Sequence, residues 1–330
     1  MAEMTPEKIA AQEEAFERTE WERQRIEYYL RIRYDFRACD IDTWLDTLYN
    51  QQKMVYKAKK DPSWNQVRKG AGIGFWENTF AFVSEEKKKE IKTKKEVVCK
   101  ELQEEVDKAN AAERKRCNVH NARLSERLKA KLNRLTSFDP DEIEEYFTFA
   151  LNLDTFILEG NEYHFNYNLV YDADKKQLIV DCNLPSIGDI SRIKEWKTDK
   201  NNEVVPKEMN KTDFLEMYER ILFDISLRVV GVLFESDTNH VLQSIIFNGS
   251  CVYDDWQENP TIIISFEILH SQYSYSRIRR MDCISKSEIA KLKDVRYLAD
   301  ITNEKPPSDL WGTPPSKLVT PIRSSWGLKR

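Results

Sequence analysis

Residues 165–197 read FNYNLVYDADKKQLIVDCNLPSIGDISRIKEWK, and they decide the fold of the C-terminal half of the chain. Hydrophobic and aromatic residues occupy every second position from Phe165 to Tyr171 and again from Leu178 to Leu184. This period is typical of strands with one buried face. The turn-forming residues 172–176 join the two runs into a β-hairpin. Pro185 has no amide hydrogen to donate and therefore ends the second strand.

Helices are expected on both sides of this hairpin. Asp139 followed by Pro140 predicts the start of a helix over 141–151, with Glu142 at the position of a capping-box acid. After a basic segment at 192–200, a wide apolar face at helical spacing predicts a longer helix over 212–234.

Two further apolar runs, at 243–248 and 261–269, predict a second pair of strands around a polar loop. Ser285 and Glu288 predict the capped start of a last helix that ends near 294. The order helix, hairpin, helix, hairpin, helix predicts an α+β fold, with a small antiparallel sheet packed on one long helix.

The N-terminal half is expected to be helical. Residues 5–58 carry apolar side chains at helical spacing, and Asp61-Pro62 breaks the pattern. Residues 84–136 contain no Gly or Pro and predict one long, highly charged helix or a helical pair. Its narrow apolar stripe, from Val98 to Leu135, resembles that of coiled coils and favours either self-association into a homo-oligomer or packing within its own chain. We therefore divide the chain into a helical region at 1–83, a long arm at 84–137, an α+β domain at 138–303 and a Pro-rich extended tail at 304–330.

Charge is distributed unevenly along the chain, whose net charge is −5. Residues 51–137 carry 22 Lys and Arg against 12 Asp and Glu, whereas residues 138–330 carry 22 against 32. A basic middle segment predicts either an anionic partner such as DNA or docking onto the acidic part of the same chain. The basic candidates for contact with phosphates are Lys57, Lys59 and Lys60, then Arg114, Lys115 and Arg116, and then Arg277, Arg279 and Arg280 close to Tyr273 and Tyr275.

Composition indicates a cytoplasmic protein that does not bind membranes. No run of 18 apolar residues and no signal peptide are present. The six cysteines are scattered without C-x-x-C spacing, which favours reduced thiols over a disulfide framework or a metal site. The glycines of residues 70–74 do not match a nucleotide-binding motif, so we expect a turn there and no cofactor.

Several segments resemble a module of bacterial restriction-system proteins, in which the module precedes an Mrr-type nuclease domain. The resemblance rests on the hairpin with its Leu-Pro ending and Lys194-Glu-Trp-Lys197, and extends over residues 100–303. Its other segments are 141–147, 225–237, 244–249 and 281–292. The resemblance implies a role in antiviral defence. Only about 27 residues follow the module, fewer than a nuclease domain requires, so we expect that domain to be absent.

Three hypotheses for function follow. The first is a non-catalytic interaction or sensing component of a restriction-like defence system, which docks a partner enzyme and also DNA. The second is a Mg²⁺-dependent nuclease of the PD-(D/E)xK type that uses Asp181, Glu195 and Lys197, since two acids and a lysine are the groups this chemistry requires. The third is a DNA-binding adaptor that acts through the basic helical segment.

Overall fold

The computed structural model describes residues 5–34, 36–74, 85–158, 161–163, 166–251, 261–275, 285–292 and 294–297. These residues form two compact units. The first contains the chain up to Trp44 and from Asn133 onward, and the second contains Leu45–Leu132. The N-terminal helix therefore belongs to the same unit as the α+β domain, although the sequence places them in separate regions, 1–83 and 138–303.

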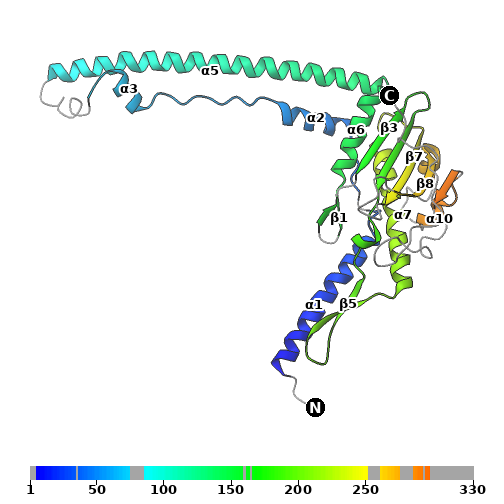
Figure 1. Ribbon diagram of the computed structural model, residues 1–330. Coiled ribbons are helices and arrows are strands. Elements are labelled where there is room, and N and C mark those ends of the chain that lie inside the picture. Colours follow the sequence, from blue (N-terminus) through cyan, green and yellow to red (C-terminus); the bar gives the residue numbers. More distant parts are fainter. Residues whose placement is uncertain are drawn as a thin grey trace. The chain divides into compact units, whose positions relative to one another are not determined.

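The first unit contains a five-stranded sheet with the strand order β3-β4-β7-β8-β9. These strands are β3 (Tyr167–Asp172), β4 (Gln177–Asn183), β7 (Ser244–Cys251), β8 (Thr261–Leu269) and β9 (Asp294–Tyr297). Figure 1 shows the sheet together with the helices α6 and α7 of the same unit. The expected α+β fold, with a long helix in the N-terminal half and a small sheet with a helix after it, is confirmed.

The hairpin expected at 165–184 is present as β3 and β4, with Asp172 opposite Gln177 at the turn. Lys176 closes this turn with a positive φ of 50°. The strand β4 is buried along both faces from Gln177 to Cys182, whereas the sequence predicts only one buried face. The neighbours β3 and β7 cover only the edges of β4. Burial of both faces requires packing above and below the sheet, which an alternating pattern does not indicate.

One pair of neighbouring strands is parallel, so the sheet is mixed and not purely antiparallel as the sequence predicts. The strands β4 and β7 run in the same direction, with Gln177 opposite Ser244, whereas all the other neighbours are antiparallel. A parallel pair requires a crossover between the strands, and the helix α7 (Lys211–Ser236) lies in that crossover. The amide of Gln243 donates to the carbonyl of Lys176 at 2.7 Å and sets the register where β7 begins.

The helix α7 is the central element of the first unit. Asn210 caps it by accepting a hydrogen bond from the amide of Asp213, and 20 of its 26 residues are buried. Among these is Arg228, whose guanidinium makes two 2.7 Å hydrogen bonds to the carboxylate of Asp154. Since both side chains are nearly inaccessible to solvent, each charge depends on the other for stabilisation.

The helix α6 (Pro140–Leu153) begins where the sequence predicts. The Asp139 side chain accepts from the amide of Asp141 at 3.1 Å and Pro140 occupies the first turn. Glu142, which the sequence assigns to a capping box, accepts hydrogen bonds from the guanidinium of Arg134. The helix packs beside β3 and α7.

A two-stranded sheet packs against α1 (Pro6–Tyr29). Its strands are β5 (Ile193–Thr198) and β6 (Val204–Glu208), so the segment at 192–200 is largely a strand. The Thr19 hydroxyl accepts from the amide of Trp196 at 2.9 Å and also lies 3.2 Å from its carbonyl oxygen. These long-range contacts explain why the segment pairs as a strand.

Shorter elements complete the described part of the first unit. They are β1 (Phe156–Leu158), β2 (Asn161–Tyr163), η2 (Ile187–Asp189), α8 (His270–Tyr275) and α10 (Ser285–Ile289). The last helix expected up to 294 ends at Ile289, and β9 follows it. The expected Pro-rich tail at 304–330 lies outside the described residues.

The second unit contains most of α2 (Ile41–Gln52), α3 (Trp64–Gly70) and most of α5 (Glu85–Thr136). The expected long charged helix is present as α5, which has 52 residues. Residues 53–63, between α2 and α3, are non-helical, although the sequence predicts helix up to residue 58. We call this extended segment the strap, and Figure 1 shows it running alongside α5.

A membrane-spanning helix is not found in the described parts of the chain. Each helix there is too short or too polar to cross a bilayer.

We expect Arg228→Met to lower the free energy of unfolding by about 3–5 kcal/mol, because it leaves the buried Asp154 carboxylate without its counter-charge. Denaturant titration monitored by circular dichroism measures the change. Replacing both partners, Asp154→Asn with Arg228→Met, removes the uncompensated charge and recovers at least about 1 kcal/mol of the loss.

The matched control is Arg31→Met, which removes an exposed ion pair with Glu27. It is expected to cost no more than about 0.5 kcal/mol. Equal losses in the buried and exposed variants would contradict the central role of the Arg228–Asp154 pair.

Candidate functional site

Two asparagine side chains of α5 bind the backbone of the strap. The amide of Asn121 accepts from the N–H of Met54 at 2.9 Å and donates to the carbonyl of the same residue at 3.0 Å. Asn110 binds Lys59 in the same way, at 2.8 Å and 3.3 Å. Each asparagine therefore satisfies both polar groups of one strap residue, as a neighbouring strand would.

The spacing of these contacts matches helix geometry to extended-chain geometry. Asn110 and Asn121 are 11 residues apart, which corresponds to about 16 Å along an α-helix. Met54 and Lys59 are five residues apart and span about 17 Å when extended. Since the two lengths agree, the strap is nearly fully extended. It runs antiparallel to α5, because the earlier strap residue, Met54, pairs with the later helix residue, Asn121.

Further contacts hold the strap along its length. The Arg114 guanidinium lies over the ring of Tyr56, 4.8 Å from its centroid. Gln103 donates to the carboxylate of Asp61 at 3.1 Å. The strap is thus in contact with α5 from Met54 to Asp61.

The strap presents lysines to solvent. Tyr56 is half-buried against α5, whereas Lys57, Lys59 and Lys60 are exposed. None of these three ammonium groups has a carboxylate within 4.0 Å among the residues that the structure describes. Residues 45–132 together carry 21 Lys and Arg against 13 Asp and Glu, so the second unit has a net charge of +8.

The structure brings together two of the basic groups found in the sequence. Arg114 lies over the strap between Met54 and Lys59, beside the exposed strap lysines. Lys115 and Arg116 point about 100° and 200° around the helix from Arg114, because successive residues of an α-helix turn by that angle. Arg116 also pairs with Glu113 at 3.9 Å. Of the three neighbours, Arg114 is therefore the one that lies over the strap itself.

A shallow groove of about 550 Å³ flanks α5 at the same level. Its described lining includes Asn110, Arg114, Lys115 and Asn118. The groove places Lys115 on the flank of the strap surface, which extends the basic area around the helix. We call the surface formed by Lys57, Lys59, Lys60, Arg114 and Lys115 the strap surface.

Other candidates from the sequence lie elsewhere or are not described. Arg277, Arg279 and Arg280 lie outside the described residues. Tyr273, their expected aromatic neighbour, is buried and donates to Glu235 at 3.0 Å. Residues 70–74 form the end of α3 and a turn, in which Gly72 has a φ of 65°.

The three residues of the nuclease hypothesis lie on two different sheets. Asp181 lies on β4 and accepts from Asn248 of β7 at 2.7 Å. Glu195 and Lys197 lie on β5, where Glu195 pairs with Lys197 at 3.3 Å and with Lys207 at 2.7 Å. Both lysines lower the pKa of the Glu195 carboxyl, chiefly by hydrogen bonding. Within the described ranges, no three His, Cys, Asp or Glu side chains are grouped so as to hold a metal ion.

Asn110 and Asn121 are the functional residues that sequence reasoning missed. Asparagine is unfavourable inside a helix because its side chain competes for backbone hydrogen bonds. Two such residues 11 apart on a long helix lie within about 20° of one another on its surface. That pattern is a signal for a shared partner, although it does not say which segment the partner is.

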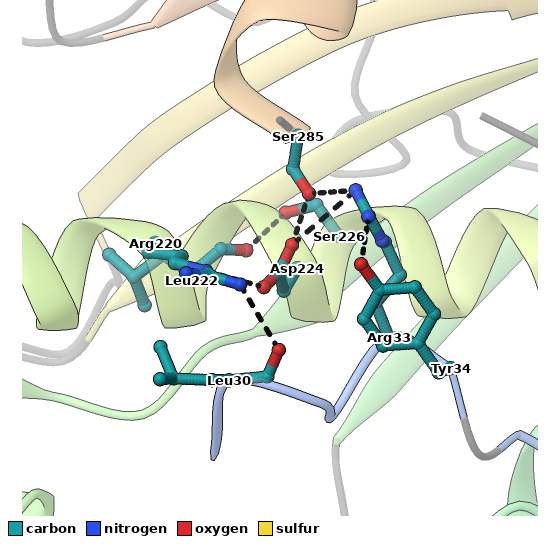
Figure 2. Close-up of polar contacts among 8 residues, drawn as sticks. All are labelled: Leu30, Arg33, Tyr34, Arg220, Leu222, Asp224, Ser226 and Ser285. Carbon is teal, nitrogen blue, oxygen red and sulfur yellow. Dashed lines mark hydrogen bonds and ion pairs between the residues drawn. The ribbon is translucent and has the colours of Figure 1, made fainter. Parts of the chain in front are cut away.

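A second polar cluster lies in the first unit, where α10 contacts α7 (Figure 2). Arg33 donates to the hydroxyl of Ser285 at 2.5 Å, and Ser285 donates to Asp224. Burial raises the pKa of the Asp224 carboxyl above its ordinary value of 3.8, although the Ser285 hydrogen bond and the Arg33 charge oppose this effect.

A cavity of about 340 Å³ adjoins this cluster. Its lining contains acids and bases in equal number, namely Glu216, Glu219 and Asp224 with Arg33, Arg220 and Lys286. Lys286 pairs with Glu219 at 2.6 Å, and Arg220 pairs with Asp224 at 3.5 Å. Ser285 and Lys286 of α10 thus bind Asp224 and Glu219 of α7, and these contacts fasten α10 to α7.

Comparison with protein-family models, curated proteins and solved structures gives no match for this chain. The resemblance to the restriction-system module therefore remains a prediction, and function is argued from the surfaces described above.

We expect Asn110→Asp to loosen the strap, because the carboxylate cannot donate to the carbonyl of Lys59 and places two acceptors face to face. Loss of a hydrogen bond with this repulsion costs about 1–3 kcal/mol locally. Hydrogen exchange measured by mass spectrometry is expected to speed up about tenfold in peptides covering residues 53–61.

The control is Asn118→Asp, which makes the same chemical change on an exposed part of the same helix. Strap exchange that responds equally to both substitutions, or to neither, would show that the asparagine contacts do not hold the strap.

Asp224 is expected to make the stability of the first unit depend on pH. Its folded-state pKa lies above the unfolded value, so its contribution is present at low pH and is lost as pH rises through the folded pKa. The unfolding free energy of the wild type relative to Asp224→Asn should therefore decrease as pH is raised from about 4 to 7. Urea titrations across this range test the trend, and a difference that grows with pH would contradict it.

Proposed function

We propose that this chain is a non-catalytic interaction component of a restriction-like defence system that binds nucleic acid through the strap surface. The observation that carries the proposal is the group of exposed lysines on the strap, whose backbone α5 holds, with Arg114 beside them. The defence context is supported by the resemblance of residues 100–303 to the restriction-system module.

Electrostatics favours a polyanion as the partner of the strap surface. Phosphate contacts supply most of the non-specific affinity of proteins for nucleic acids, because each neutralised phosphate releases a counterion. The strap lysines have no ion-pair partner in the described residues, so they need not break an internal pair to bind phosphate. Because α5 already orders the strap backbone, presenting these lysines together costs less entropy than in a free chain.

The contrast between the two units also supports this assignment. Residues 45–132 have a net charge of +8, whereas the rest of the chain carries 30 Lys and Arg against 43 Asp and Glu, a net charge of −13. A polyanion is attracted by the second unit and repelled by the first.

The direct test measures binding of a fluorescent oligonucleotide at several salt concentrations. Replacing Lys57, Lys59 and Lys60 together with Ala is expected to weaken binding and reduce the salt-dependence slope by about two to three. A charge-matched control replaces Lys175, Lys194 and Lys200 of the first unit with Ala. Identical slopes for the two triple variants would overturn the proposal.

The same samples, incubated with Mg²⁺ or Mn²⁺, separate binding from catalysis. Binding without cleavage agrees with a non-catalytic component. Cleavage that disappears in Lys197→Ala would overturn the non-catalytic role and favour the nuclease hypothesis based on Asp181, Glu195 and Lys197.

A further inference from the structure

An exposed tryptophan lies at the end of the strap. Trp64 follows Lys60 by four residues, and 55% of its surface is accessible. Tryptophan buries a large apolar area when it is packed, so an exposed indole next to a row of lysines is an informative feature.

The position of Trp64 is fixed by the contacts of α3. Ser63 and Gln66 form a capping box at the start of this helix. At the other end, Gly70 lies so close to α5 that a Cβ there would come within 2.8 Å of Val98. The capping box fixes the first turn of α3, and the close approach of Gly70 to Val98 seats the helix on α5, so the indole is held at the surface.

Two cations lie over the indole ring of Trp64. Lys95 of α5 is 5.2 Å from the ring centroid, and Arg68 of α3 is 5.7 Å from it. The accessible part of the ring offers a stacking surface to a nucleobase, and the two cations over the ring offer charged partners to its phosphates. The strap lysines continue the positive charge from this point along α5.

The strap surface and the residues around Trp64 form one continuous basic track along α5, and contacts with α5 define its length. Met54 meets Asn121 at one end and Trp64 meets Lys95 at the other, 26 helical residues away. This separation corresponds to about 39 Å along the helix axis. The track is therefore long enough for several nucleotides of a single strand, whose bases are free to stack on exposed rings.

We infer that the strap surface, together with Trp64, Lys95 and Arg68, is a binding site for single-stranded nucleic acid in which one base stacks on Trp64. The inference rests on the proposed function and goes beyond it by naming the class of ligand. A duplex keeps its bases stacked on one another, so it does not offer a face to the indole. DNA and RNA share the required chemistry.

The test compares oligo-dT, oligo-U and a DNA duplex, each about 15 nucleotides long. Trp64→Ala is expected to weaken binding of the single strands about tenfold and to leave duplex binding unchanged. Trp64→Phe keeps a ring for stacking and should remain within about threefold of the wild type. Circular dichroism verifies that both variants are folded.

Tryptophan emission distinguishes stacking from a structural role of Trp64, because only a base in contact with the indole quenches its emission. Saturating oligo-dT is expected to quench the emission of the wild type, and the quench should be lost in Trp64→Phe although anisotropy still shows binding. Binding of either oligo-dT or oligo-U with these properties supports the inference, and a difference between them identifies the preferred sugar.

The failures of the two proposals can be distinguished. Single-strand affinity unchanged in Trp64→Ala, with affinity still lost in the strap triple-lysine variant, would overturn the stacking site and leave the proposed function standing. No binding of any oligonucleotide, or equal binding by the strap variant and its charge-matched control, would overturn both.

Discussion

The first unit is built around a helix that has almost no solvent-facing side. A helix buried on all sides must satisfy its polar groups within the protein, since an unpaired buried charge is far more costly than an exposed one. In α7, Asp224 and Arg228 are one turn apart, and both are buried. Arg228 is neutralised by Asp154 of the α6 end, whereas Asp224 faces Arg33 and Ser285. The requirement to pair two charges thus ties three distant parts of the chain to one helix.

The second unit is stabilised by different means. Its strap has few apolar residues to bury, and the backbone is instead bound by the amide side chains of Asn110 and Asn121. This arrangement leaves the lysines of the strap outside the contact and exposed to solvent. A segment held through its backbone can keep a strongly basic surface, because the hydrogen bonds do not depend on which side chains face outward. The architecture therefore accounts for both the extended conformation and the charge that the proposed function requires.

Local sequence patterns predict some of the secondary-structure elements, and contacts with distant residues determine the others. The alternation in residues 165–184 predicts β3 and β4, and Asp139 with Pro140 predicts the start of α6, because turns and caps depend on local chemistry. The absence of Gly and Pro over 85–136 predicts α5. In contrast, the end of α2 at Gln52 and the strand β5 depend on partners 50 or more residues away, so local patterns do not determine them. The same applies to the parallel pairing of β4 with β7, which depends on the path of α7.

For the candidate site, the sequence alone determined which residues carry charge and that the middle of the chain is basic. Only the tertiary structure decided which of these residues share a surface. Consecutive residues on a helix diverge by about 100°, so Arg114 and Arg116 separate although they are neighbours in sequence. The strap lysines lie beside Arg114 although more than 50 residues intervene, because two asparagines spaced to match an extended chain hold the strap against α5. Local propensity sets the elements, and contacts between residues distant in sequence place their side chains together.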